Sequence, residues 1–247
     1  MGAPDASRSL SGAGEQPMKQ LESCGRTVRV FGAEQAENVI WMHTFSDEGA
    51  AAFALLPPEM QAQTALVTIA MTDPDWNAQL SPWEAPALFK KEPPFAGNAD
   101  TYLHILTDSM MPEILAQTGL SPQHDLIAGY SLAGLFALYA LWNTDRFHGG
   151  ASISGSLWYP GFSAYLREKA PERKPDFVYL SLGDRECRAR NPLLASVQEK
   201  TEEIAALLRN AGIPAVFELN PGGHTNQAAK RTGKALMRLI SQYNSAS

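Results

Sequence analysis

Asp125-Leu126-Ile127-Ala128-Gly129-Tyr130-Ser131-Leu132-Ala133-Gly134 is the stretch that decides the fold. Its first four residues are suited to a buried strand, and the apolar residues 135–142 that follow it are typical of a buried helix. A strand that turns into a helix at a serine is a nucleophile elbow. In such a turn the hydroxyl of Ser131 stands exposed above the sheet, and the N–H of Leu132 lies where an oxyanion would form.

The elbow departs from its usual pattern at one position. The backbone at the serine is strained, so the residues two before and two after it must be small. Gly129 satisfies this requirement, but Ala133 stands where a second glycine is usual, and Gly134 follows. We expect the turn to accommodate one additional methyl group. The alternative is a glycine-rich turn with an incidental serine, because short motifs also match by chance.

Composition sets the class of protein. The chain has 247 residues, a formal net charge of −6 and no run rich in lysine or arginine, which argues against a nucleic-acid partner. Two cysteines are too few for a disulfide framework and suit a reducing, cytoplasmic location. No signal peptide is evident, and no apolar run reaches the roughly 20 residues of a membrane span. We expect a disordered tail over residues 1–17 and a single domain over residues 18–247.

Strand and helix patterns alternate along the chain, which predicts an α/β fold. This alternation is typical of a doubly wound, mostly parallel sheet with helices on both faces. Residues 21–31 add a hairpin about Gly25-Arg26. Besides the elbow, the expected strands are residues 38–42, 65–70, 150–154, 177–182 and 215–219. The expected helices, besides 135–142, are residues 47–56, 100–115 (where a proline at 112 kinks the helix or starts a new turn), 162–169, 192–210 and 227–243.

Residues 73–98 have no periodicity and read as a long loop, and loops of this length inside a domain are usually functional. Only about 20 residues separate the expected strands 150–154 and 177–182, too few for a separate cap domain. Any wall over the site must therefore come from the loop. Its aromatic residues, Trp76, Trp83, Phe89 and Phe95, form a rim for an acyl or aryl group or pack the loop onto the domain.

The serine needs a base and an orienting acid. His224 lies in a Gly-Gly-His turn after the final expected strand, and a surface histidine is the alternative. Asp184 and Glu186 both follow the strand 177–182, so spacing leaves either as the acid. The chain order serine, acid, histidine matches the order in serine hydrolases of this architecture. Both turns follow strands at the edge where sites of open α/β sheets form.

A second oxyanion donor is expected in the loop after the strand 38–42, from the amide of Thr44 or Phe45. We expect His43 to pack within that loop. No pair among the histidines other than His224 has metal-ligand spacing with a carboxylate or thiolate nearby, so the sequence predicts no metal and no cofactor.

From about residue 38 onward, the chain resembles the branch of the α/β-hydrolase superfamily that holds esterase D and the enterochelin (siderophore) esterases. The segments that carry the resemblance are Gly129-Tyr130-Ser131-Leu132-Ala133-Gly134, Ser154-Gly155-Ser156-Leu157-Trp158-Tyr159, Gly183-Asp184-Arg185-Glu186 and Gly222-Gly223-His224. The resemblance implies an α/β-hydrolase fold, favours Glu186 as the acid, and places Trp158 beside the active site. With Tyr130, Trp76 and Trp83, Trp158 completes the expected substrate contacts.

The function that the resemblance implies is a serine carboxylesterase that hydrolyses a small or medium acyl or aryl ester through an acyl-serine intermediate. Two alternatives remain. One is an acyltransferase that uses the same acyl-enzyme, and the other is a non-catalytic binding protein on the hydrolase fold. A siderophore ester is a narrower substrate, for which the sequence shows no basic cluster.

Overall fold

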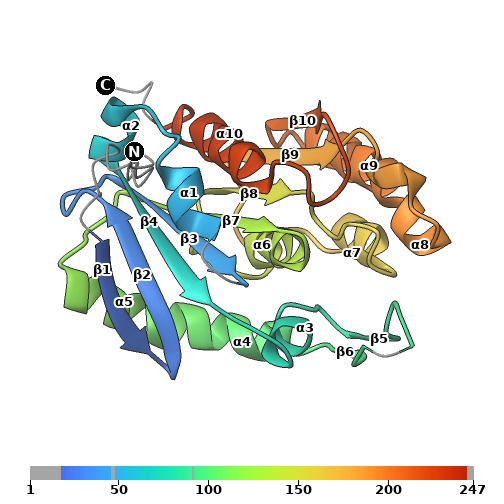
Figure 1. The fold of residues 1–247 in the computed structure, drawn as a ribbon, viewed down its shortest axis with the longest axis horizontal. Coiled ribbons are helices and arrows are strands. Elements are labelled where there is room, and N and C mark those ends of the chain that lie inside the picture. Colours follow the sequence, from blue (N-terminus) through green and yellow to red (C-terminus); the bar gives the residue numbers. More distant parts are fainter. Residues whose placement is uncertain (1–17, 46–47, 91, 244–247) are drawn as a thin grey trace, which may run out of the picture.

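The computed structural model describes residues 18–45, 48–90 and 92–243, so the predicted tail over residues 1–17 lies outside the described residues. An eight-stranded sheet in the order β1-β2-β4-β3-β7-β8-β9-β10 forms the centre of the fold (Figure 1). Its strands are β1 (Met18–Ser23), β2 (Arg26–Gly32), β3 (Asn38–Thr44), β4 (Thr64–Ala70), β7 (His124–Tyr130), β8 (Gly149–Ile153), β9 (Phe177–Gly183) and β10 (Ala215–Asn220). The short strands β5 (Glu84–Ala85) and β6 (Phe95–Ala96) pair with each other outside this sheet.

Helices cover both faces of the sheet, as predicted. They are α1 (Glu48–Phe53), α2 (Pro58–Gln63), α3 (Asp75–Gln79), α4 (Ala99–Ile105), α5 (Met111–Thr118), α6 (Leu132–Asn143), α7 (Phe162–Glu168), α8 (Pro192–Ala195), α9 (Val197–Asn210) and α10 (Ala228–Ile240). Side chains of α1 and α10 share one buried cluster with Ile40 of β3, and those of α4, α5, α6 and α9 share the other with Trp41. The two core layers follow from the alternation of side chains along each strand.

The sheet is mostly parallel, which confirms the predicted α/β-hydrolase fold. Strands β3, β4 and β7–β10 run parallel, whereas β2 is antiparallel to both β1 and β4. The β1–β2 pair is the predicted opening hairpin. The chain leaves β3 for β4 on one side and later returns to β7 on the other, so the sheet changes winding direction between β3 and β7. Ligands of open α/β sheets bind at such a switch point, outside the carboxyl ends of the strands.

One predicted segment differs in detail from the structure, and another takes one of its two predicted forms. The segment 73–98 is not one irregular loop, because it contains α3 and the β5–β6 pair. The helical stretch from α4 to α5 takes one of its two predicted forms, because Pro112 stands in the first turn of a new helix, α5. A π-helical turn (Leu106–Met110) lies directly before α5, and the first turn is the part of a helix that tolerates proline.

The connection from β8 to β9 contains only α7 among the described elements, so no separate cap covers the sheet, as predicted. Across the described part of the chain, the structure has no helix with both the length and the apolar character needed to cross a bilayer.

Candidate active site

Ser131 occupies the turn between β7 and α6 in the strained conformation expected of an elbow. Its φ is 58° and its ψ is −123°. A Cβ added at Gly129 would lie 2.1 Å from the carbonyl oxygen of Ala133, so a side chain at residue 129 has no room. The methyl group of Ala133 itself is buried within the packed turn, so the departure from a second glycine leaves the elbow intact.

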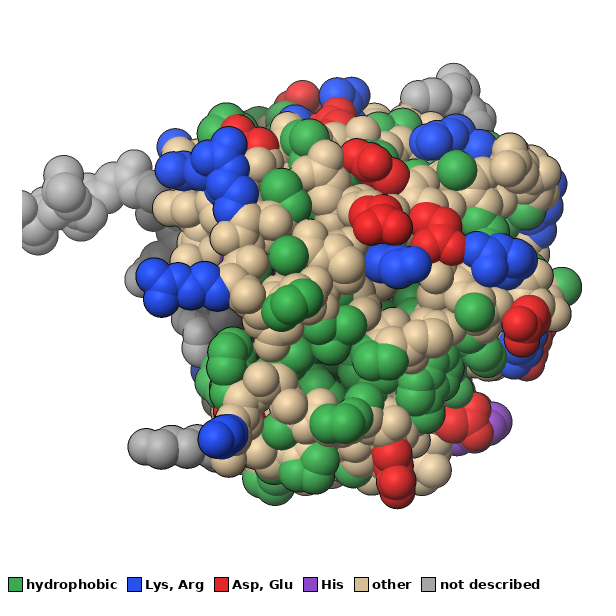
Figure 2. Space-filling view, turned by 90° about the vertical axis from the view of Figure 1, so that its right-hand side faces the viewer, with side chains coloured by type: hydrophobic (Ala, Val, Ile, Leu, Met, Phe, Trp, Pro, Cys, Tyr) green, Lys and Arg blue, Asp and Glu red, His purple; other side chains and the backbone are tan. Residues whose placement is uncertain are grey.

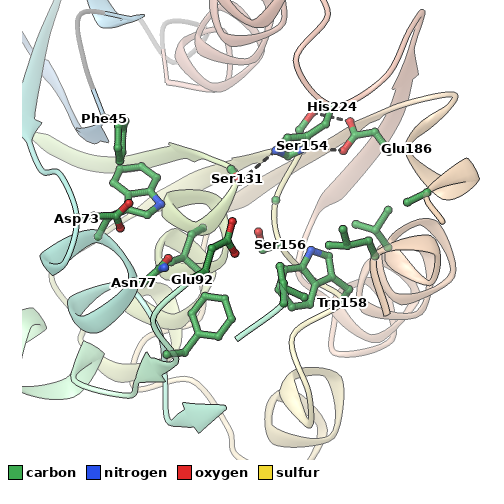
Figure 3. Close-up of a pocket in the computed structure, with 18 of the residues that line it drawn as sticks. Phe45, Asp73, Asn77, Glu92, Ser131, Ser154, Ser156, Trp158, Glu186 and His224 are labelled. Atoms are coloured by element: carbon green, nitrogen blue, oxygen red, sulfur yellow. Dashed lines mark hydrogen bonds and ion pairs between the residues drawn. The ribbon is translucent and has the colours of Figure 1, made fainter. Parts of the chain in front are cut away.

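His224 lies beside Ser131 although 93 residues separate them, because the turn after β10 reaches the end of β7. Its Nε2 is 3.1 Å from the Ser131 hydroxyl, and its Nδ1 is 2.8 Å from Oε2 of Glu186 (Figure 3). The structure therefore brings together a hydroxyl, an imidazole and a carboxylate in a continuous hydrogen-bonded chain. Their order and spacing match the requirements for general-base activation of a serine.

The Glu186 carboxylate is almost fully buried at the start of a short 3₁₀ turn (Glu186–Arg188) after β9. Its second oxygen, Oε1, accepts hydrogen bonds from the N–H of Gly183, the hydroxyl of Ser154 at 2.8 Å and Nη1 of Arg231 at 3.1 Å. Burial raises the pKa of Glu186, but the hydrogen bonds from His224, Gly183 and Ser154, together with the charge attraction of His224, outweigh burial and lower the pKa overall. This carboxyl group is held in its ionised form.

Asp184, the other acid that the sequence left open, is placed differently. Its side chain is half exposed, and its Oδ1 accepts the N–H of Gly222 at 2.8 Å. The same oxygen is 3.9 Å from Nε of Arg185. Asp184 thus supports the turn that carries the histidine, while Glu186 makes the contact with the imidazole.

Two backbone amides flank the serine at the switch point. Leu132 begins α6, so its N–H belongs to the first turn of the helix, where amides have no intrahelical acceptor. Thr44 is still part of β3, paired with Ala70 of β4, and its carbonyl accepts the N–H of Met71 at 2.9 Å. Phe45 is the first residue beyond the strand, and its half-exposed ring packs edge-on against Trp76 at 5.6 Å. Thr44 and Phe45 are the two residues predicted to supply the second oxyanion donor. Only Phe45 lies beyond the paired residues of the sheet.

A cavity of about 590 Å³ opens beside Ser131. Trp76 and Phe95 line it from the segment 73–98, and Trp158 lines it from the β8–α7 connection. Figure 2 looks onto this side of the molecule and shows hydrophobic side chains gathered around a hollow, with charged side chains along one border. The apolar lining suits an acyl or aryl group of a substrate.

Besides the candidate acid Glu186, four charged side chains line this cavity. Asp73 and Glu92 lie on the side of α3 together with Asn77, while Arg185 and Arg188 come from the turn after β9 (Figure 3 shows the acidic side). The two arginines are the basic pair that sequence reasoning missed, because the turn carries them to the cavity only in the folded chain. With Glu186 included, acidic side chains outnumber basic ones in the cavity lining by three to two.

The two remaining predicted substrate contacts, Tyr130 and Trp83, differ in their position: one lines a cavity and the other packs against the domain. Tyr130 lines a second, smaller cavity of about 300 Å³ that also reaches Ser131, and its hydroxyl donates a hydrogen bond to the His224 carbonyl. Trp83 lines neither cavity, which corrects its predicted role as a substrate contact. Its indole N–H donates to the Pro160 carbonyl at 2.9 Å, and its ring packs against Tyr165, so its large apolar surface is used to hold the loop down.

Arg231, on α10, is a site neighbour that sequence reasoning missed. It lies four residues before Ala235 on the buried stripe of this helix, and its side chain is almost fully buried. A basic residue on an apolar stripe, seven positions after the candidate histidine, is the signal that could have found it.

An eight-stranded, mostly parallel sheet with a serine elbow and a hydrogen-bonded Ser–His–Glu chain at its carboxyl edge defines an α/β hydrolase. More narrowly, the chain belongs to the Esterase family, described as "Putative esterase", whose model matches residues 34–230. Among the described residues, no group of three histidine, cysteine or acidic side chains is arranged to hold a metal ion.

Comparison with individual proteins extends this assignment. The chain is 26% identical over 157 residues to the uncharacterized protein YbbA of Bacillus subtilis (strain 168), a match that covers 62% of this chain and 63% of the relative. The chain therefore spans less than two thirds of the length of this curated relative.

Two solved structures show the same fold. An IroE-like serine hydrolase from Shewanella oneidensis superposes with a TM-score of 0.75 at 18% identity, covering 93% of this chain and 81% of its own. The siderophore hydrolase EstA from Aspergillus nidulans superposes with a TM-score of 0.73 at 17% identity, covering 97% of this chain and 99% of its own.

Proposed function

We propose that this protein is a serine esterase that hydrolyses a small or medium acyl or aryl ester through an acyl-serine intermediate. The observation that carries the proposal is the pair of hydrogen bonds through His224, 3.1 Å to Ser131 and 2.8 Å to Glu186. Membership of the Esterase family supports the reaction type.

In the proposed reaction, Nε2 of His224 accepts the hydroxyl proton as Ser131 Oγ attacks the carbonyl carbon of the ester. The N–H groups of Leu132 and Phe45 donate to the oxyanion of the tetrahedral intermediate. The imidazolium then gives its proton to the departing alcohol, leaving the acyl-serine. Water attacks this second ester with the same base, which releases the carboxylic acid and restores the serine. Glu186 keeps the Nδ1–H of the imidazole oriented throughout.

The lining of the larger cavity favours an ester without a large net charge. EstA, which shares this fold, is named a siderophore hydrolase, and Arg185 and Arg188 supply positive charge at the cavity of the present chain. Asp73 and Glu92 oppose them with two negative charges, and the Glu186 carboxylate adds a third acidic group to the lining. We therefore propose a neutral acyl or aryl ester, whose apolar group contacts the aromatic lining, over a polyanionic iron complex.

The test is turnover of p-nitrophenyl butyrate by the Ser131→Ala variant. We expect the variant to fold, to lose at least about 10³-fold in kcat, and to lose labelling by a fluorophosphonate probe. Ser121→Ala, an exposed serine before β7, is the matched control and should behave as the wild-type protein. Turnover retained by Ser131→Ala would overturn the proposal.

Product analysis with added alcohols addresses the acyltransferase alternative. We expect free acid as the main product. If the main product is instead an ester of the added alcohol, the reaction is acyl transfer and not hydrolysis. Failure of the wild-type protein to react with the fluorophosphonate would instead favour a non-catalytic binding protein.

A further inference from the structure

A buried guanidinium group lies directly behind the candidate triad. The Arg231 side chain is 2% exposed, and it extends from α10 toward the turns that carry Glu186 and His224. Neither proton transfer nor oxyanion binding in the proposed reaction uses this residue. A buried cation of this kind requires partners, because an unpaired charge in the interior is strongly unfavourable.

The four acceptors of Arg231 belong to three separate turns. Nη1 donates to Oε1 of Glu186 at 3.1 Å and to the hydroxyl of Ser154 at 3.0 Å. Nη2 donates to the carbonyls of Pro221 at 3.0 Å and Gly223 at 2.9 Å. The guanidinium thus joins the turn after β9, the turn after β8 and the turn after β10, at the carboxylate itself and at the residue that precedes the histidine.

The turn after β9, which carries Glu186, packs closely against the guanidinium group. A Cβ added at Gly183 would lie 2.2 Å from the carbonyl oxygen of Gly222 and 2.6 Å from Nη2 of Arg231, so residue 183 has no room for a side chain between the histidine turn and the guanidinium. Ser154 completes the arrangement, because its hydroxyl accepts from Arg231 and donates to Glu186. A planar fork with several donors is specific to arginine, and lysine cannot reach the same four acceptors at once.

Stability alone is a poor reason for such an arrangement. Replacing a buried ion pair by apolar residues is often neutral or stabilising. Asp184 accepts the Gly222 N–H and so supports the same turn without a buried charge.

We propose that Arg231 is a positioning residue of the active site. It fixes the Glu186 carboxylate and the His224 turn relative to each other, so that the imidazole faces the acid on one side and Ser131 on the other. The inference rests on the proposed function. Its chemical role is indirect, because the guanidinium contacts the acid and not the reacting atoms.

Steady-state kinetics with p-nitrophenyl butyrate test this role in Arg231→Lys and Arg231→Met. We expect kcat to fall about 10-fold for lysine and about 100-fold for methionine, with KM changed less than about 2-fold, as for loss of a group that acts in the transition state. Arg238→Met is the matched control, since Arg238 lies on the same helix, is exposed and pairs with Glu218. Circular dichroism melts establish that each variant is folded.

A double-mutant cycle separates positioning from a general structural effect. If Arg231 acts through Glu186, adding Arg231→Met to Glu186→Gln should lower kcat less than about 3-fold further, because residues that act as one unit are strongly non-additive. If the fold-decrease in kcat of the double variant equals the product of the fold-decreases of the two single variants, the proposal is overturned. A wild-type kcat in folded Arg231→Met would also overturn it. If the methionine variant does not fold, a wild-type kcat in Arg231→Lys overturns the proposal.

The outcome for Ser131→Ala is independent of this result. Turnover retained by Ser131→Ala refutes the proposed function, whatever the Arg231 variants do. An inactive Ser131→Ala variant combined with wild-type kcat in the Arg231 variants refutes only the positioning role.

Discussion

We predict that His43 makes the stability of this protein depend on pH. Its imidazole is buried near the end of β3, with Nε2 2.8 Å from the Tyr102 hydroxyl and the ring edge-on to Phe136. Burial, followed by repulsion from Arg26, lowers the pKa of His43 from 6.5 to about 3. Between these two values the unfolded chain binds a proton that the folded chain excludes. The contribution to stability is therefore complete above about pH 6.5 and is lost as the pH falls toward 3.

The size of the effect follows from this difference in pKa. Each pH unit between the two values removes about 1.4 kcal/mol from the free energy of unfolding. Between pH 7 and pH 4 the loss from His43 amounts to about 3 kcal/mol, which is a large part of the roughly 5–15 kcal/mol that stabilises a typical domain.

The His43→Gln variant isolates this contribution. Glutamine can keep a hydrogen bond to Tyr102 but does not titrate, so we expect its free energy of unfolding to fall by about 3 kcal/mol less than that of the wild-type protein between pH 7 and pH 4. Urea unfolding at pH 7, 5.5 and 4 measures the difference. His104→Gln, an exposed histidine on α4, is the control and should keep the wild-type pH dependence. Parallel curves for the wild-type protein and His43→Gln would refute the reasoning.

Two further predictions concern the acid and the elbow. Glu186→Gln should lower kcat by about 10³–10⁴-fold, as expected when the imidazole loses its orienting carboxylate, whereas Asp184→Asn should stay within about 5-fold because an amide oxygen still accepts the Gly222 N–H. A larger loss at Asp184 in steady-state kinetics would transfer the acid role to that residue. Gly129→Ala should lower the free energy of unfolding by roughly 1–3 kcal/mol through overpacking, whereas Ala133→Gly should lower it by about 1 kcal/mol or less, through lost helix propensity at the start of α6. Equal denaturant midpoints for Gly129→Ala and the wild-type protein would contradict the packing of the turn.

The parts of the site that could be predicted from the sequence are those that one local segment specifies. The elbow needs a buried strand, small residues and a helix within 18 residues of chain, and all of these features are visible in the sequence. His224 follows a strand directly, so topology alone carries it to the carboxyl edge of the sheet. The predicted strands match the structure for the same reason, because nearly continuous apolar runs have few other uses in an α/β fold.

The parts that could not be predicted depend on direction within a turn or on distant partners. Asp184 and Glu186 are two residues apart, and only the 3₁₀ turn after β9 determines which carboxylate faces the imidazole. Trp83 and Trp76 belong to the same loop and have the same chemistry, yet one packs on Tyr165 and the other lines the cavity. Arg231 is 45 residues from Glu186 and 77 from Ser154, beyond the reach of any local pattern.

Two neighbouring turns explain how the site holds its geometry. Ser131 after β7 and Ser154 after β8 both have positive φ, a conformation that costs a non-glycine residue of order 1–3 kcal/mol. Backbone hydrogen bonds hold these conformations, from the Ser131 N–H to Ile153 at 3.0 Å and from the Ser156 N–H to Ser131 at 3.0 Å. One turn presents the candidate nucleophile, and the other presents the hydroxyl that binds Glu186. The two turns are bonded to each other, so a shift of Ser154, whose hydroxyl binds Glu186, also shifts Ser131. The three proposed catalytic residues are therefore positioned as one unit.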